Sequence, residues 1–432
     1  MHHRIRASLL ALGIAVLAVM FGGSMLAVPA AADEEAEQEA EQSIGGTLRD
    51  GEGEPVAGVT IAVTDSDGAE VGEGVTDDEG QWTVPLPAGG TYTVLLLEET
   101  LPDEIELRDP DRNPLEVQVR PGTSRPAVFQ LGEDSGARGQ LEAIGRAVGN
   151  GVKFGLIIAM CAVGLSLIFG TTGLINFSHG ELVALGGLLA WFFNVTLGIH
   201  LIPAAIITII LVAGFGSGLE KGMFLPLRRR RLGLFQLLVI TIGLALAIRF
   251  LNLLFFGGAP RTYRDYVGQQ AVQLGPISLT PRDMIIIGLS VVILVAVATV
   301  LQKTKIGKAV RAVSDNPALA SASGIDVDRV TLFVWTAGAG LAATGGIFFG
   351  SAVAADYFMG FRLLLLMFAA VILGGIGTAY GAMVGGLIIG LVTELSVLWS
   401  PAELKIMWAL LALIIALLVR PQGILGRAER VG

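Results

Sequence analysis

The side chains best able to do chemistry in this chain lie close together at residues 170–187, GTTGLINFSHGELVALGG. Hydroxyl, amide, imidazole and carboxylate groups occur there between two strongly apolar runs: Thr171, Thr172, Asn176, Ser178, His179 and Glu181. Groups of these kinds can bind or conduct a polar solute. A metal site is not expected, because no second histidine or cysteine is near, and adjacent Ser178 and His179 give no acid–base arrangement. We therefore predict a substrate pathway without catalytic residues or a metal.

The glycines of this stretch predict a break in a membrane helix. Backbone N–H and C=O groups need partners in hydrocarbon, so non-helical chain at membrane depth survives only against protein or a water-filled cavity. Transporters use such breaks to build polar substrate sites near the middle of the membrane. The alternative interpretation places residues 171–180 in a cytoplasmic turn, where Asn176 or Ser178 caps the next helix and Glu181 completes a capping box. The two interpretations are compatible.

A second candidate break lies at residues 373–386, LGGIGTAYGAMVGG, which contain six glycines. The candidate pathway residues there are Gly374, Gly375, Gly377 and Thr378. Close helix packing is the alternative explanation of these glycines. Two glycine-interrupted spans in the two halves of a membrane protein are the best sequence indication of a central site.

A third feature, NPALASASG at residues 316–324, predicts a short helix outside the membrane. Asn316 suits the N-cap, Pro317 suits the first helical position and Gly324 suits the C-terminal stop. The small residues between them are only weakly apolar and would gain little from lipid. They suit insertion into a groove on another protein, and the alternative is a surface loop.

The composition indicates a protein that spans a membrane several times. Of the 432 residues, 53% are hydrophobic and 16% are charged, and the mean hydropathy is +0.69. The net charge of −9 is the sum of two parts of opposite charge. Residues 33–143 carry 27 acidic and 6 basic side chains, whereas the remainder of the chain carries 11 acidic and 23 basic side chains. An acidic solvated domain therefore joins a hydrophobic body with basic loops. The single cysteine, Cys161, excludes a disulfide framework.

Hydropathy predicts about eight or nine membrane helices, since a hydrocarbon core of about 30 Å takes roughly 20 helical residues. The apolar segments are residues 146–169, 181–197, 201–225, 233–256, 284–302, 330–351, 363–380, 382–398 and 404–419. Residues 1–32 have the layout of a secretory signal peptide, either cleaved or retained as an anchor. Basic clusters at residues 228–231 and 303–311, with Arg420, Arg427 and Arg430, are expected on the cytoplasmic side. An exported N-terminal domain then requires an odd number of crossings.

Residues 44–132 predict a small antiparallel β-sandwich. Short runs of alternating apolar and polar residues are separated by turn sequences such as DSDG, DDEG and PAGG. The segments GEPVAGVTIAVTD and TDDEGQWTVPLPAGGTYTV resemble the carboxypeptidase regulatory-like domain. We expect this domain to lie outside the cytoplasm, between an acidic linker at residues 33–43 and a second linker at residues 133–145.

Residues 146–428 resemble the permease subunits of branched-chain amino-acid ABC transporters, the LivH and LivM family, and are closer to the LivH branch. Four ordered segments carry the resemblance: GLSLIFGTTGLINFSHGELVALGG, KTKIGKAVRAVSDNPALASASGIDVDRV, FAAVILGGIGTAYGAMVGG and RPQGILGR. The fold expected is an all-α polytopic membrane domain with some interrupted helices, preceded by the all-β sandwich. The resemblance implies an amino-acid importer in the cytoplasmic membrane of a prokaryote, in contact with lipid and not with nucleic acid.

The resemblance also implies the partners. They are a second permease subunit, LivM-like or an identical copy, two cytoplasmic ATPases and an extracytoplasmic solute-binding protein. The chain lacks a G-x-x-x-x-G-K-[ST] motif, so the partner subunits would use ATP, and this chain is expected to hold no cofactor and to be no enzyme. The helix that couples to an ATPase would involve Arg311, Asp315, Asn316, Pro317, Ala318, Leu319, Ala320 and Gly324.

Three other functions stay open. A permease for urea or short amides would belong to the same family and carry the same motifs. A secondary transporter or channel would work without ATPases and would need a carboxylate deep in a span, for which Glu181 and Glu394 are candidates near expected helix ends. A membrane-bound sensor would act through the outer domain.

Overall fold

A computed structural model describes residues 42–426, apart from residues 51–54, 67, 103–104, 106, 108–112, 120–123, 128, 130, 132–135, 267–268, 270 and 421. The chain forms two compact units, divided between Leu141 and Glu142. The expected signal peptide at residues 1–32 and most of the acidic linker lie outside the described residues, as do Arg427 and Arg430.

The N-terminal unit is all β, as the alternating sequence pattern predicts. Its described residues form two sheets, with the strand orders β4-β1-β7 and β3-β2-β5-β6. Apart from the parallel pair β1–β7, neighbouring strands are antiparallel. The strands are β1 (Ser43–Thr47), β2 (Thr60–Asp65), β3 (Glu70–Val75), β4 (Gln81–Pro85), β5 (Gly90–Leu96), β6 (Leu115–Val119) and β7 (Ser124–Pro126), with one 3₁₀ turn, η1 (Glu98–Thr100).

One apolar core holds the two sheets together. Ile44 and Trp82 come from the first sheet, and Ile61 and Val94 come from the second. Their neighbours along each strand are more exposed, as in β4, where exposed and buried residues alternate. This period of two places one face of each sheet in the core and explains why the sequence pattern identified the domain.

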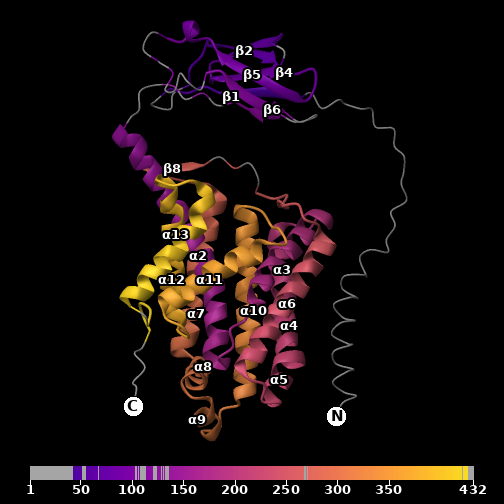
Figure 1. The fold of residues 1–432 in the computed structure, drawn as a ribbon, viewed down its shortest axis with the longest axis vertical. Helices are drawn as coiled ribbons and strands as arrows, with labels where there is room; N and C mark the ends of the chain where they lie inside the picture. The colour runs from indigo at the N-terminus through magenta and orange to yellow at the C-terminus, as the bar shows by residue number, and fades with distance from the viewer. Residues whose placement is uncertain are drawn as a thin grey trace, which may run out of the picture. The chain divides into compact units, whose positions relative to one another are not determined.

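The C-terminal unit is a bundle of helices (Figure 1). The longer helices are α2 (Gly136–Thr172), α3 (His179–Trp191), α4 (Leu201–Leu219), α6 (Leu234–Phe256), α7 (Pro281–Lys303), α10 (Val327–Ala352), α11 (Met359–Gly374), α12 (Ala379–Leu395) and α13 (Lys405–Val419). The short helices and strands are η3 (Phe192–Thr196), η4 (Glu220–Phe224), α5 (Leu225–Arg229), β8 (Val272–Leu274), β9 (Ile277–Leu279), α8 (Lys305–Asp315), α9 (Pro317–Ala322), η5 (Ser396–Leu398) and η6 (Ala402–Leu404).

Each of the nine apolar segments expected from the sequence contains a helix, and the predicted all-α polytopic fold is confirmed. Among the described residues, seven helices are long and apolar enough to cross a membrane. The other two, α3 and α11, have only 13 and 16 residues. Two expected boundaries are wrong. The first helix begins at Gly136, inside the expected linker at residues 133–145, and the segment expected at residues 363–380 ends its helix at Gly374 because positive-φ glycines follow.

The short helices α8 and α9 lie together at one end of the bundle, and β8 lies at the other (Figure 1). Arg229, at the end of α5, pairs with Asp328 at the start of α10, with a distance of 2.6 Å between Nη2 and Oδ2. The two basic segments that the sequence assigns to the cytoplasm, residues 228–231 and 303–311, are therefore at the same end of the bundle. We call it the basic end.

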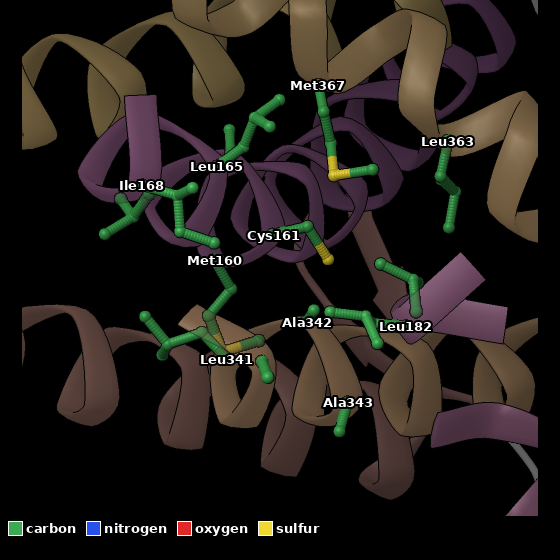
Figure 2. Packing of buried hydrophobic residues seen from close by; sticks show 14 of the residues in the cluster. Met160, Cys161, Leu165, Ile168, Leu182, Leu341, Ala342, Ala343, Leu363 and Met367 are labelled. Atoms are coloured by element: carbon green, nitrogen blue, oxygen red, sulfur yellow. The ribbon is translucent and has the colours of Figure 1, made fainter. Parts of the chain in front are cut away.

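Glycines let the central helices approach backbone to backbone. In α10, a Cβ atom on Gly346 would lie 2.0 Å from the carbonyl oxygen of Val183 in α3. In α12, a Cβ atom on Gly386 would lie 2.5 Å from the Cα atom of Ala159 in α2. Figure 2 shows apolar side chains of α2, α3, α10 and α11 packed around Cys161. Small residues at helix interfaces provide the close packing on which association in membranes depends.

The structure predicts that Gly346→Ala destabilises the bundle. The added methyl group overlaps a backbone carbonyl that cannot move independently. We therefore expect the free energy of unfolding to fall by about 1–3 kcal/mol. Gly288 in α7 is the matched control, because nothing lies within 4 Å of its Cβ position. Thermal unfolding of the purified chain in detergent should show a lower midpoint for Gly346→Ala and an unchanged or higher one for Gly288→Ala. Equal midpoints would contradict this account of the glycines.

A carboxylate fastens the loop after α6 to the start of α4. Asp265 Oδ2 accepts hydrogen bonds of 2.8 Å from the Leu201 N–H and from the Asn194 side-chain amide. The basic side chains of His200 and Arg264 lie within 4 Å. Burial alone would raise the pKa of the Asp265 carboxyl, but these hydrogen bonds and neighbouring charges outweigh burial and hold the pKa below its ordinary value of 3.8.

This lowered pKa predicts the pH dependence of the Asp265 contribution. Ionised Asp265 stabilises the fold above the pKa of the unfolded chain, and that contribution is lost as the pH falls through the lower folded pKa. The difference in unfolding midpoint between the natural chain and Asp265→Asn should therefore be largest near neutral pH and should shrink below about pH 4. Melting curves at several pH values test this. A difference that does not change with pH would show that ionisation of Asp265 is irrelevant.

Candidate functional site

The polar stretch at residues 170–187 contains a helix break, as predicted. Six residues, 173–178, separate the end of α2 from the start of α3, and the backbone turns at Gly173 with a φ of +66°. His179 Nε2 lies 3.1 Å from the carbonyl oxygen of Cys161. At 1.5 Å per residue, Cys161 is about 16 Å back along α2 from Thr172. Residues 173–178 therefore return from the basic end, and α3 begins deep inside the bundle.

The hydrogen bonds at this break differ from the predicted capping box. Ser178 makes no side-chain cap for α3. Its hydroxyl instead donates to Asn176 Oδ1 at 2.6 Å, and its N–H donates to the same oxygen at 3.1 Å. The Glu181 carboxylate binds Arg249 rather than the backbone of Ser178. The capping box is wrong because Asn176 already binds the serine hydroxyl and a cation binds the glutamate.

Four of the six predicted pathway side chains are completely buried in the described chain. They are Asn176, Ser178, His179 and Glu181, each with an exposed fraction of 0%. The hydroxyls of Thr171 and Thr172, in contrast, donate to carbonyl oxygens one turn earlier in α2, so the helix itself satisfies them. Asn176 Nδ2, His179 Nδ1 and Glu181 Oε2 are buried and have no hydrogen-bond partner among the described residues. Three buried side-chain atoms at the start of α3 therefore lack a hydrogen-bond partner among the described residues.

Arg249 is the functional candidate that the sequence analysis missed. Its Nε and Nη2 donate to Glu181 Oε1 at 3.0 and 2.6 Å. The guanidinium carbon lies 5.3 Å from the ring centre of Phe358 and 4.6 Å from that of Phe361, within the range of cation–π attraction. A signal was present, because an arginine near the middle of the apolar run LALAIRFLNLL needs a partner in a membrane.

The second glycine-rich stretch is also a break, and it meets the first. Helix α11 ends at Gly374, and Gly375 and Gly377 have φ values of +112° and +79°, which favour glycine. The Thr378 hydroxyl donates to the Gly375 carbonyl at 2.8 Å within the turn. A Cβ atom on Gly170 would lie 3.1 Å from the carbonyl oxygen of Gly377. The two predicted breaks are therefore in contact, although close packing also explains Gly374, whose Cβ position is blocked by residue 381.

The end of the described chain completes the second break. The N–H groups of Ile424 and Leu425 donate to the carbonyl oxygens of Leu373 and Gly374 at 2.8 and 2.9 Å. These are carbonyls of the last turn of α11, which have no partner within their own helix. The segment RPQGILGR, noted only as a motif in the sequence, thus supplies hydrogen bonds to an interrupted helix.

The third sequence feature forms the predicted short helix. The Asn316 side chain accepts from the Leu319 N–H at 3.0 Å, Pro317 occupies the first helical position, and Gly324 follows the helix with a φ of +85°. Asp315, Asn316, Pro317 and Ala318 are exposed, and the Leu319 side chain is 64% exposed. Ala320 is buried, and Arg311 Nη1 donates to the carbonyl oxygen of Leu301 at 2.5 Å.

The helix that precedes α9 contacts the first break. Ser314, near the end of α8, lies against α2 just before the first break, since a Cβ atom on Gly170 would be 2.9 Å from the Ser314 hydroxyl oxygen. Gly170 therefore lies between the α8–α9 segment on one side and Gly377 of the second break on the other. Gly170 thus contacts the second break directly and the third feature through α8, the helix that precedes α9.

This combination of a helical membrane bundle, two interrupted helices and an exposed helix at the basic end defines a membrane transport subunit. Residues 147–419 match the family described as "Branched-chain amino acid transport system / permease component", and the chain belongs to that family. Residues 43–131 match the carboxypeptidase regulatory-like domain, which confirms the assignment of the N-terminal unit.

Curated relatives agree with the family assignment. The chain is 30% identical over 295 residues to the high-affinity branched-chain amino acid permease LivH of Escherichia coli K12, covering 65% of this chain and 94% of LivH. It is 27% identical to BraD of Pseudomonas aeruginosa, also named as a high-affinity branched-chain amino acid permease, over 65% of this chain and 95% of BraD. The ribose import permease RbsC of Escherichia coli K12 is 27% identical over 54% of this chain and 72% of RbsC. The resemblance to the LivH branch is therefore confirmed.

The Glu181–Arg249 pair should be costly to break from one side only. Arg249→Gln leaves the carboxylate of Glu181 buried without a counter-charge, and we expect a loss of about 3–5 kcal/mol in the free energy of unfolding. The double variant Glu181→Gln/Arg249→Gln carries no charge at either position and should recover most of that loss. Unfolding of the purified chain in detergent measures both values. A double variant no more stable than the single variant would show that the ion pair is not the important contact.

Proposed function

We propose that the chain is a membrane-spanning subunit of an ATP-driven importer that carries branched-chain amino acids across the cytoplasmic membrane by alternating access. The observation that carries the proposal is the polar helix break at the depth of Cys161, inside a domain that matches the branched-chain permease family over residues 147–419. A polar segment there serves a solute pathway, since lipid would leave its backbone groups without partners. The LivH and BraD relatives support amino acids as the substrate class.

The proposed partners are a second permease subunit, LivM-like or a second copy of this chain, two cytoplasmic ATPases and an extracytoplasmic solute-binding protein. ATP is bound and hydrolysed by the ATPases and not by this chain. The exposed helix α9 supports an ATPase contact, because its leucine projects from a helix of small residues. The basic end then faces the cytoplasm, and the loop containing Asp265 faces the binding protein.

The proposed mechanism transmits ATPase movement through Gly170. When the ATPases close, they displace α9 and with it Ser314, which lies against the end of α2. A shift of α2 moves both breaks together, because Gly170 also contacts Gly377. The two sides of the membrane can then be opened in turn around the buried groups at the start of α3.

Reconstitution tests this function directly. The chain, assembled with its partner subunits in proteoliposomes, should take up radiolabelled leucine only when ATP is supplied and the binding protein is present. ATP-dependent uptake of urea or a short amide instead would assign the chain to the alternative substrate class within the family. Uptake without ATPases would exclude the importer mechanism and indicate a secondary transporter or channel.

The exposed leucine of α9 provides a test of coupling. Leu319→Ser removes an apolar side chain that would be buried against an ATPase, and the loss of about 2 kcal/mol of burial should weaken that contact more than tenfold. Leu398, 40% exposed in the connection between α12 and α13, is the matched control. We expect Leu319→Ser to reduce ATP-driven uptake and co-purification with the ATPases, whereas Leu398→Ser should leave both unchanged. Equal effects of the two variants would contradict a coupling role for α9.

A further inference from the structure

In the ion pair at the start of α3, neither charged group makes all the hydrogen bonds that it could. Arg249 donates from Nε and Nη2 to a single oxygen of Glu181, and its Nη1 donates to no described residue. The second carboxylate oxygen, Glu181 Oε2, is buried and has no partner among the described residues. A guanidinium and a carboxylate normally form two parallel hydrogen bonds. This pair instead leaves one donor group and one acceptor oxygen without a partner among the described residues.

Because the pair lies deep in the bundle, leaving these polar atoms without hydrogen bonds costs free energy. Lys153 in α2 contacts Asp283 at the far end of the bundle, 3.1 Å away, and Thr172 marks the basic end. Cys161, the contact of His179, lies between the two, so Glu181 is near the middle of the bundle along its length. An unpaired polar atom at that depth costs free energy, and a structural pair would be more stable with both oxygens bound or with apolar replacements.

The guanidinium also reaches the surface of the chain. The Arg249 side chain is 11% exposed, and Phe358, which stacks against it, is 37% exposed. A cation at this depth does not face lipid, because charged side chains within membranes face a cavity or another protein segment. The surface formed by Arg249, Phe358 and Phe361 therefore faces the substrate passage or the subunit that shares it.

We propose that Arg249 binds the carboxylate of the transported amino acid, that Glu181 both orients Arg249 and receives the substrate ammonium group at Oε2, and that Phe358 and Phe361 contact the apolar side chain. A zwitterion with a hydrocarbon side chain needs one cation, one anion and an apolar wall within a few ångströms. Nη1, Oε2 and the two aromatic rings are those groups in one cluster. The proposal rests on the proposed function, since it assumes that amino acids pass through this chain.

The double variant Glu181→Gln/Arg249→Gln separates binding from support of the fold. It removes both charges together, so it leaves no unpaired ion to unfold the chain, while an amide pair can still hydrogen-bond. In the assembled complex, we expect ATP-driven uptake of radiolabelled leucine to fall by about 10-fold to 100-fold, the loss expected for one or two charge-assisted hydrogen bonds. The unfolding midpoint should stay close to that of the natural complex, which shows that the loss of uptake does not come from unfolding.

The matched control is a second ion pair buried in the same bundle. Lys153 and Asp283 have side chains that are 14% and 8% exposed, and they lie away from both breaks. Arg282 also lies 3.5 Å from Asp283, but its side chain is 24% exposed and can be solvated when the carboxylate is replaced. Lys153→Gln/Asp283→Asn should retain uptake within about twofold, because no substrate group meets that pair. Equal loss of uptake in both double variants would overturn the proposal, since neutralising any buried pair would then have the same effect.

Chemical modification of a cysteine provides the second readout, because the chain contains only Cys161 as a natural thiol. In a Cys161→Ala background, Arg249→Cys/Glu181→Gln should react with water-soluble methanethiosulfonates in the working complex. Addition of an aminoethyl cation should restore part of the leucine uptake, whereas a neutral methyl group of the same reagent class should not. No reaction from either side, or equal effects of both reagents, would overturn the proposal.

The outcomes also separate this proposal from the proposed function. If the natural complex takes up no amino acid, the proposed function fails. If the natural complex and Glu181→Gln/Arg249→Gln take up leucine equally well, the function stands and the role of Arg249 in recognition is refuted.

Discussion

The structure depends on keeping a carboxylate, a guanidinium and a length of non-helical backbone in the centre of a membrane bundle. Glu181 and Arg249 neutralise each other, and the aromatic rings beside Arg249 replace part of the hydration that it lacks. Asn176 binds the Ser178 hydroxyl and N–H and so fixes the turn before α3. Without these partners, the polar segment would be driven towards water at the end of the bundle, and α3 could not begin at the depth of Cys161.

Glycine makes this arrangement geometrically possible. The chain must bring the end of α2, the turn after α11 and the end of α8 into one small region, and Gly170 is the point at which they meet. A larger side chain would separate the breaks from each other and from the segment that carries α9. The same residue type therefore serves close packing between α3 and α10 and the contact of α2 with both α8 and the second break.

Much of this organisation could be predicted from residue patterns that act locally. The period-two alternation identified the N-terminal sheets, hydropathy located the helices, and Asn316, Pro317 and Gly324 defined α9 because capping depends on near neighbours. The partner of Glu181 was missed, since it lies 68 residues away and only the packing of α3 against α6 brings it near. The capping box failed for the same reason: a favourable local pattern was overridden by a stronger tertiary ion pair. The contact between the two breaks likewise depends on helix packing that no short segment encodes.

The hydrogen bonds from Ile424 and Leu425 to the last turn of α11 have a consequence for biosynthesis. A ribosome makes α11 well before it makes these two residues, and α12 and α13 must both be inserted in between. During that interval the carbonyl groups at the end of α11 have to be held by water or by the insertion machinery. The last turn of α11 therefore gains its final hydrogen-bond partners only after translation has passed residue 425, so the second break is among the last parts of the bundle to be completed.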